Sequence, residues 1–205
     1  MYNIPYFKAE DHAEVIDFMR ENPFAILCGI NETGVPVATH LPLLLEERDN
    51  KLFLQGHSMK KQDHTDAYYQ NPNVLAIFSG AHSYVSASWY RKQQVASTWN
   101  YQAVHVTGLL RILDEQALHA TLTHVTRTFE TADSPSRVEH MNPEYVAQMM
   151  KAIVAFEIEV TAIEHVFKLS QNRDAHSYHN IMTHLREKDP GAQQIAQIME
   201  EKKKD

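Results

Sequence analysis

The sequence predicts an α+β fold built on a six-stranded antiparallel β-sheet that is closed or nearly closed, with helices around it. Short runs of alternating or continuously apolar residues recur between residues 24 and 160, and turn-forming residues separate them. Helical periodicity appears before residue 22, between residues 114 and 152, and near the C-terminal end. Many half-apolar strands are buried most simply when their sheet curls on itself.

The first helix is predicted after Asp11, which together with Glu14 has the spacing of a capping box. It should end before Pro23, because the residue preceding a proline is disfavoured in a helix. Residues 24–30 then form an apolar strand, and residues 31–34 have the composition of a turn. These features predict a hairpin.

The second strand of that hairpin is predicted over residues 35–45. Pro36 and Pro42 cannot donate ladder hydrogen bonds, so the strand should lie at an edge or contain a bulge near residues 39–42. We expect this interruption to leave room for a ligand pocket.

The later elements follow the same two patterns. Further strands are predicted at residues 51–55, 74–78, 82–88, 101–113 and 153–160, and helices at residues 58–70, from 114 to about 129, and from 143. In the last of these strands, Ala155, Glu157 and Glu159 alternate with apolar residues, which predicts one solvent-facing side. Two helical stretches after Ser177 suggest a helical C-terminal appendage at residues 171–205, beside a barrel domain at residues 1–170.

Composition limits the classes of function. The chain has 205 residues, of which 43% are hydrophobic and 22% charged, as in ordinary globular proteins. A formal net charge of −7 disfavours a protein that wraps nucleic acid with its whole surface. We expect no membrane span and no export signal, and the single cysteine, Cys28, is expected to be a small buried apolar residue in a cytoplasmic protein.

Common catalytic and metal motifs are absent. The sequence has no GxSxG, GxGxxG, GxxxxGK[ST] or HExxH pattern, and its thirteen histidines lack a recognisable zinc spacing. We therefore predict no metal site and assign no catalytic residue, although His40 and His57 are candidates for a general acid because imidazole titrates near neutral pH.

Four polar clusters at predicted strand ends are the candidate binding site. They offer hydroxyls, amides and cations for a phosphate, and an aromatic surface for a ring system. The candidate residues are Thr39, His40, Gly56, His57, Ser58, Lys60, Lys61, Thr98, Trp99, Asn100, Lys168, Ser170, Gln171 and Asn172. Around Ser58, a glycine, a hydroxyl and two lysines come between a strand and a predicted helix, where backbone N–H groups could help to hold an anion, or where they simply form a solvated helix start.

The same residues carry a resemblance to a known family. The segments THLPL (39–43), GAHSYVSASWY (80–90), TWNY (98–101) with AVHV (103–106), and KLSQN (168–172) are similar to the PaiB family, and the similarity covers nearly the entire chain. The resemblance implies a split barrel of the FMN-binding type, and a homodimer with the flavin site at the subunit interface. In that superfamily a Ser-Arg-Lys turn holds the flavin phosphate; here Ser58 with Lys60 and Lys61 stands in the comparable place, without the arginine.

The resemblance also implies a role as a negative regulator of sporulation and degradative-enzyme (protease) genes, with DNA as a partner by family analogy only. Two alternatives stay open: a flavin-dependent oxidoreductase or flavin reductase, in which FMN takes up hydride, and a haem-binding split barrel.

Overall fold

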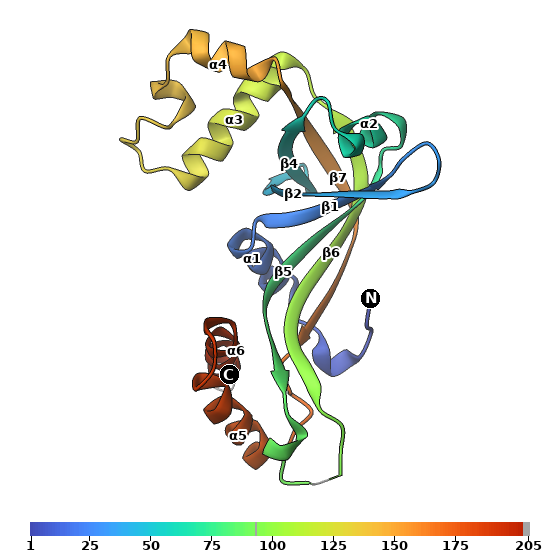
Figure 1. Ribbon diagram of the computed structural model, residues 1–205, viewed down its shortest axis with the longest axis vertical. Helices are drawn as coiled ribbons and strands as arrows, with labels where there is room; N and C mark the ends of the chain where they lie inside the picture. The colour runs from blue at the N-terminus through green and yellow to red at the C-terminus, as the bar shows by residue number, and fades with distance from the viewer. Residues whose placement is uncertain (93, 203–205) are drawn as a thin grey trace. The chain divides into compact units, whose positions relative to one another are not determined.

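The computed structural model describes residues 1–92 and 94–202 (Figure 1). Its helices are α1 (His12–Glu21), α2 (Asp63–Gln70), α3 (Glu115–Phe129), α4 (Pro143–Met150), α5 (Ala175–Arg186) and α6 (Pro190–Glu201), with short 3₁₀ turns at Pro5–Phe7, Ala87–Trp89 and Val138–His140. Its strands are β1 (Phe24–Ile30), β2 (Pro36–Pro42), β3 (Leu44–Arg48), β4 (Lys51–Met59), β5 (Asn73–Val85), β6 (Thr98–Ile112) and β7 (Ile153–Lys168).

The strands form one sheet in the order β2-β1-β5-β6-β7-β4-β3, so the described sheet has seven strands and the prediction of six was wrong. The strand predicted over residues 35–45 divides at Leu43 into β2 and β3. The division occurs where Leu43 leaves the ladder and donates its N–H to the carbonyl of Pro23 at 2.8 Å. By contrast, the strand predicted at residues 74–78 and the first part of the strand predicted at residues 82–88 belong to the single long strand β5. The second prediction was wrong beyond Val85, where the 3₁₀ turn Ala87–Trp89 follows.

The place of β2 and β3 in the sheet explains why it curls. β2 pairs antiparallel with β1 at one edge, and β3 pairs antiparallel with β4 at the other. Only Leu43 separates these two strands in the chain, so the two edges must come close together, as the contacts between β2 and β4 also indicate. The antiparallel sheet is therefore a curled, barrel-like sheet rather than a flat one.

The chain divides into two compact units, and β5, β6 and β7 contribute to both. The first comprises residues 1–18, 79–104 and 164–205, and the second comprises residues 19–78 and 105–163. In the first unit, α5 and α6 lie side by side and share an apolar core with the end of β5. This core includes Val85, Leu169, Ile181, Leu185 and Ile195. The domain boundary predicted at residue 170 stays a prediction.

In the second unit, α3 and α4 pack over β7. Leu118, Val146 and Met150 form a buried cluster with Ala155, which is fully buried. The alternation of polar and apolar residues in β7 predicted that one side of the strand faces solvent. This prediction was wrong at Ala155 and Glu157, because residues outside the strand bury both side chains. Phe78, Phe156, Leu27 and Leu54 bury the other side of the strands.

Capping explains where several helices begin. Asp11 Oδ1 accepts the backbone N–H of Glu14 at 2.9 Å, and the Glu14 carboxylate accepts the backbone N–H of Glu10. The predicted cap of α1 is therefore confirmed. Asn142 caps α4 ahead of Pro143, also as predicted.

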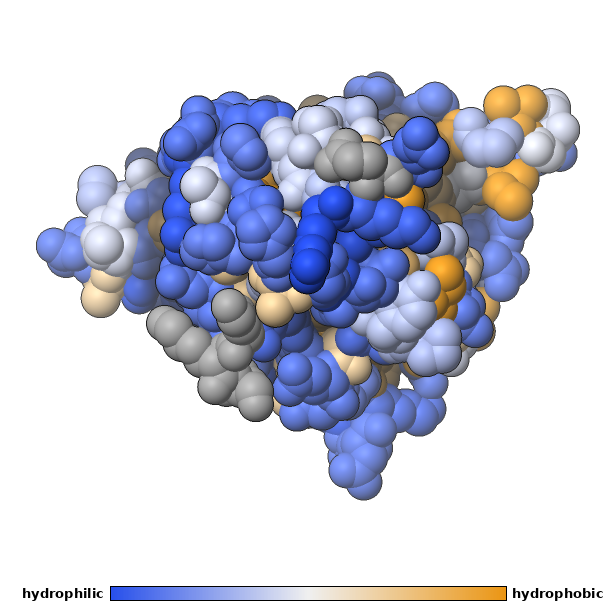
Figure 2. Space-filling model, turned by 90° about the horizontal axis from the view of Figure 1, so that it is seen from below, coloured by the Kyte–Doolittle hydropathy of each residue, from blue (hydrophilic) through white to orange (hydrophobic). Residues whose placement is uncertain are grey.

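The helix predicted over residues 58–70 begins only at Asp63, because β4 extends to Met59. Ser58 is therefore a strand residue, and the first turn of α2 carries Asp63 and Asp66. No helix in the described residues is long and apolar enough to cross a bilayer. On the face shown in Figure 2, hydrophilic residues predominate and hydrophobic residues gather in small separate groups.

Candidate functional site

The candidate residues fall into two groups, one in each compact unit. The group in the second unit is Thr39, His40, Gly56, His57, Ser58, Lys60 and Lys61. The group in the first unit is Thr98, Trp99, Asn100, Lys168, Ser170, Gln171 and Asn172. Each group is described by itself.

Four residues of the group in the second unit line one pocket of about 460 Å³. Its polar lining is Thr39, His40, His57, Ser58, Gln62 and His64, and apolar side chains such as Met59 and Ile153 complete the wall. We call it the histidine pocket. β2 supplies one side through the segment predicted to open a pocket, and β4 with the start of α2 supplies the other.

His57 has the most unusual environment in the histidine pocket. Its Nδ1 is buried and has no hydrogen-bond partner in the described residues. Burial lowers the pKa of His57 below its ordinary value, so the ring is neutral at neutral pH. A buried polar atom without a partner is costly in a folded protein and is typical of a functional group.

The other two histidines have partners at the rim. His40 is exposed, and its ring stacks on Phe24 with 6.0 Å between centroids. His64 Nδ1 lies 3.2 Å from Asp63 Oδ1, so the carboxylate orients this ring. Three imidazoles thus line one pocket in different environments.

Ser58 is buried and its hydroxyl is already engaged. Thr65 Oγ1 donates to the carbonyl of Met59 at 2.8 Å, so the Ser58 hydroxyl must donate to Thr65 Oγ1, 3.0 Å away. The oxygen of Ser58 can still accept a hydrogen bond, but the hydroxyl cannot donate one to a phosphate without breaking this pair.

Lys60 and Lys61 are exposed and do not line the histidine pocket, although Met59 and Gln62 on either side of them do. No side-chain partner of either lysine occurs among the described residues. Both cations are therefore free to reach an anion at the mouth of the pocket.

Packing, rather than ligand binding, explains why residue 56 is glycine. A Cβ at this position would lie 2.8 Å from Phe156 Cζ and 3.1 Å from Leu43 Cδ2. The close approach of these apolar side chains is sufficient to require glycine.

The group in the first unit is a hydrogen-bonded turn. Lys168 Nζ donates to Thr98 Oγ1, and Ser170 Oγ donates to Asn100 Oδ1 at 3.0 Å. Gln171 Oε1 accepts the N–H of Leu169 at 2.7 Å, and Ser170 has a φ of 64°. Burial, and then the nearby charge of Arg173, lower the pKa of Lys168. Asn172 is exposed.

Trp99 lies apart from that turn, on the exposed side of β6. It is 52% exposed, and its ring contacts those of Tyr84 and His82 at centroid distances of 5.9 and 6.0 Å. A pocket of about 280 Å³ opens beside Trp99 and His82.

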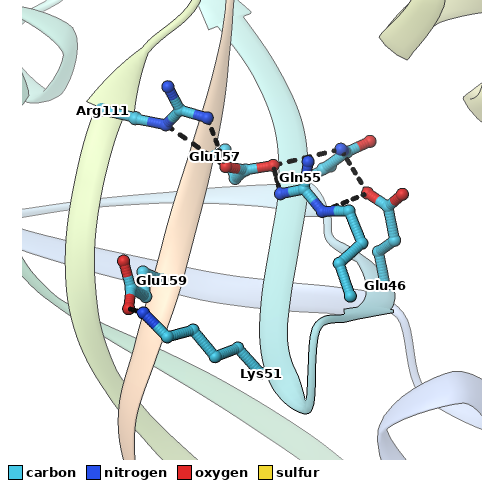
Figure 3. Close-up of polar contacts among 7 residues, drawn as sticks. Glu46, Lys51, Gln55, Arg111, Glu157 and Glu159 are labelled. Carbon is cyan, nitrogen blue, oxygen red and sulfur yellow. Dashed lines mark hydrogen bonds and ion pairs between the residues drawn. The ribbon is translucent and has the colours of Figure 1, made fainter.

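Two kinds of candidate residue were not predicted from the sequence. Gln62 and His64 were missed because the helix was predicted to begin at residue 58, whereas Gln62 is the N-cap residue of α2 and His64 lies in its first turn, at the pocket. The second kind is an ion cluster around the buried Glu157, which we call the Glu157 cluster (Figure 3). It consists of Glu46, Arg48, Gln55, Arg111 and Glu157. No local sequence pattern predicts the Glu157 cluster, because its members come from four strands.

Glu157 is 2% exposed and lies between two arginines. Arg111 donates to Glu157 Oε1 from Nε at 3.2 Å and from Nη2 at 2.9 Å, and Arg48 Nη2 donates to Oε2 (Figure 3). Gln55 Nε2 donates to Glu46 Oε2 at 2.6 Å. A buried carboxylate requires such partners, since removing one leaves an uncompensated charge.

Among the described residues, no three His, Cys, Asp or Glu side chains are grouped so that they could hold a metal ion.

Comparison with known proteins assigns the fold and family. Residues 1–162 match the family model described as "Putative FMN-binding domain". The chain is 36% identical over 206 aligned residues to "Protease synthase and sporulation protein PAI 2" of Bacillus subtilis, with 100% of this chain and 99% of that protein covered.

Two solved structures are similar in fold. The FAD and heme binding protein of Mycobacterium smegmatis has a TM-score of 0.60 at 14% identity, over 83% of this chain and 78% of that one. The flavocytochrome Anf3 of Azotobacter vinelandii has a TM-score of 0.60 at 16% identity, over 87% and 78%.

Proposed function

The chain belongs to the PaiB family of FMN-binding proteins, and we propose that it binds FMN in the histidine pocket. The observation that carries this proposal is His57, whose buried Nδ1 has no partner although the ring lines a pocket large enough for a ring system. Met59 and Ile153 supply apolar surface for the flat face of the flavin. Bound flavin would supply a ring that accepts hydride or single electrons.

The phosphate is assigned to Lys60 and Lys61, which stand between two lining residues and have unpaired ammonium groups. Ser58, whose proton is engaged with Thr65, would contribute only to the wall. The fit therefore depends on two flexible cations in place of an arginine.

The same proposal includes a homodimer with the flavin site at the subunit interface. On β1, Ile26 pairs with His40 on one side and with Ile77 on the other, and Cys28 pairs with Leu75, so these side chains share one face of the sheet. All of them are at least partly exposed, and Phe24 on the same face is 66% exposed. An apolar face of this kind suits a protein partner, and His40 belongs to both this face and the histidine pocket.

For the cellular role, we propose a negative regulator of sporulation and protease genes that works in the cytoplasm, as the family resemblance implies. The name of the Bacillus subtilis relative, which mentions protease synthase and sporulation, supports this role. DNA is a partner by family analogy only, and the net charge of −7 favours action through a local contact or another protein. A gel-shift assay on promoter DNA checks direct action: binding no tighter than to a random duplex, with or without FMN, excludes it.

A second candidate is haem binding, with or without flavin-dependent redox activity. Three histidines line one pocket, and the two structurally similar proteins are described as binding heme or as a flavocytochrome. Reduction of bound FMN by NADH or NADPH would favour the oxidoreductase alternative.

The absorbance spectrum of the purified full chain, before and after addition of FMN or haem, separates these candidates. We expect a bound flavin spectrum and no Soret shift on haem titration. The double variant Lys60→Ala/Lys61→Ala should weaken FMN binding about tenfold or more, because charge-assisted hydrogen bonds to the phosphate are lost. Riboflavin, which has no phosphate, should bind both proteins equally.

The exposed residue Lys92 in the other unit provides the matched control, and Lys92→Ala should bind FMN normally. The flavin proposal fails when neither FMN nor riboflavin binds the unaltered chain. Equal weakening of FMN and riboflavin by the lysine variant would contradict the phosphate assignment.

A further inference from the structure

A separate pocket of about 330 Å³ opens over the Glu157 cluster in the second unit. Strands supply Arg48, Arg111 and Glu157 to its floor, and α3 supplies Thr121 and His124. Small side chains, Ala117 and Ala120, line the helix side and leave the space open. We call it the arginine pocket, and none of its residues lines the histidine pocket.

The arginines have donors left over after they pair with Glu157. A guanidinium group has five N–H donors, and Arg111 directs only Nε and Nη2 to Glu157. Arg111 makes no other polar contact with the described residues, and its side chain is 69% exposed. Glu157 thus holds both guanidinium groups, and Arg48 and Arg111 also line the arginine pocket.

Thr121 supplies the pocket lining with a hydroxyl that no group of the described residues engages. It is 3% exposed, yet its hydroxyl makes no hydrogen bond with the described residues. Other threonines of α3 donate back to the helix, such as Thr123 to the carbonyl of His119 at 2.9 Å. Thr121 is four residues after Ala117 and three before His124, so all three share the helix face that lines the pocket.

The acidic groups of the pocket are already paired. Both oxygens of Glu157 accept from arginines, and Glu46 Oε2 accepts from Gln55 and lies 3.8 Å from Arg48 Nε. The pocket therefore presents guanidinium N–H groups, a hydroxyl and an imidazole that lack acceptors. A ligand that completes it must bring negatively charged oxygen atoms, because planar guanidinium groups bind carboxylate and phosphate best.

We propose that the arginine pocket is a binding site for a small oxyanion, the carboxylate or phosphate group of a small metabolite. Arg111 and Arg48 bind its oxygens, and Thr121 donates a further hydrogen bond. Glu157 is a positioning residue that holds both arginines in place. The site is independent of the flavin proposal.

Isothermal titration of the full chain with sodium acetate, succinate and inorganic phosphate, against sodium chloride at equal ionic strength, tests the proposal. We expect saturable binding of at least one oxyanion and none of chloride. Saturation by the carboxylates alone assigns a carboxylate ligand, and saturation by phosphate alone assigns a phosphate ligand. No saturation by any oxyanion overturns the proposal.

Variants decide whether binding occurs in this pocket. Thr121→Val keeps the size of the side chain but removes the hydroxyl, so affinity should fall about fivefold to tenfold. Thr123→Val, on another face of the same helix, is the matched control and should bind as the unaltered chain does.

Equal oxyanion affinity of Thr121→Val and the unaltered chain would identify an adventitious ion only and overturn the proposal. FMN binding measured on the same proteins keeps the two proposals apart. Thr121→Val should bind riboflavin as the unaltered chain does, even where it loses the oxyanion. If the unaltered chain binds no flavin, the oxyanion titrations still test the arginine pocket.

Discussion

Gly108 is the single residue whose replacement has the most direct structural consequence. A Cβ at this position would lie 2.5 Å from the backbone oxygen of Glu159 and 2.5 Å from Ile158 Cγ2. A backbone oxygen cannot move aside as a flexible side chain can. We therefore expect Gly108→Ala to reduce the free energy of unfolding by about 3 kcal/mol or more, measured by urea denaturation.

Gly191→Ala is the control for that substitution. Gly191 lies in α6, and its added Cβ would meet only Asp189 Oδ1 at 3.2 Å and the oxygen of His82 at 3.6 Å. Alanine is the better helix former, so stability should stay within about 1 kcal/mol. A Gly108 variant as stable as the Gly191 variant would contradict the close packing of β6 against β7.

The lowered pKa of His57 leads us to expect that the stability of the fold depends on pH. Burial lowers its pKa in the folded chain, as burial also lowers that of His165, so the unfolded chain takes up protons first as the pH falls. The free energy of unfolding should therefore decrease from about pH 7 to pH 5, across and below the ordinary histidine pKa of about 6.5. Replacement of His57 by Asn should flatten this dependence, measured by denaturation at both values.

His119 serves as the control for the pH experiment because it is exposed on α3. His119→Asn should leave the pH dependence of stability unchanged. A His57→Asn protein with the same acid destabilisation as the unaltered chain would show that His57 is not held neutral by burial.

At single residues, the sequence was informative where the local pattern decides the environment. Thr39, His40, His57 and Ser58 were chosen as polar residues near strand ends, and the structure brings them to one pocket. Glu157 was expected to face solvent from the alternation of β7, but it is 2% exposed and pairs with Arg48 and Arg111 from other strands. Burial by a segment distant in the chain has no signature within the strand itself.

Among the elements, α4 depends visibly on its cap. Asn142 Oδ1 accepts the N–H groups of Glu144 at 2.8 Å and Tyr145 at 3.3 Å. Asn142→Ala should reduce the free energy of unfolding by about 1 kcal/mol, while Asn142→Ser should restore most of the loss. Thermal unfolding followed by circular dichroism measures both, and equal stability of the two variants would exclude a capping role.

Elements with local start and stop signals were the ones that the sequence predicted well. Prolines and capping residues marked the ends of α1 and the beginning of α4, and an apolar run marked β1. The division between β2 and β3 was missed because it depends on Leu43 pairing with Pro23, which is a tertiary contact. Strand order depends on such contacts throughout.

For the whole molecule, the exposed apolar face of β1, β2 and β5 predicts association of two copies. Ile77 lies on this face, opposite Ile26. Ile77→Lys would place a charge in the apolar contact, so light scattering should find a dimer for the unaltered chain and a monomer for the variant. Gln197→Lys, on the exposed side of α6, should remain a dimer.

A monomer for the unaltered chain at all concentrations would exclude this association. A dimer that persists in Ile77→Lys would place the interface elsewhere. Because the flavin site is proposed to lie at the subunit interface, a monomer for the unaltered chain would also exclude that part of the flavin proposal.

The single residue between β2 and β3 restricts how the length of this chain can vary. Insertion of one residue beside Leu43 would shift β3 by one position against β4 or loosen the closure, and a one-residue shift sends every side chain of a strand to the opposite face. Insertions and deletions among homologues should therefore occur in the turn at residues 31–35 and be absent at residues 42–44. Because one residue connects β2 to β3, the pair β1–β2 and the pair β3–β4 cannot reach their final register independently. Closure of the sheet should therefore be a late and cooperative step in folding.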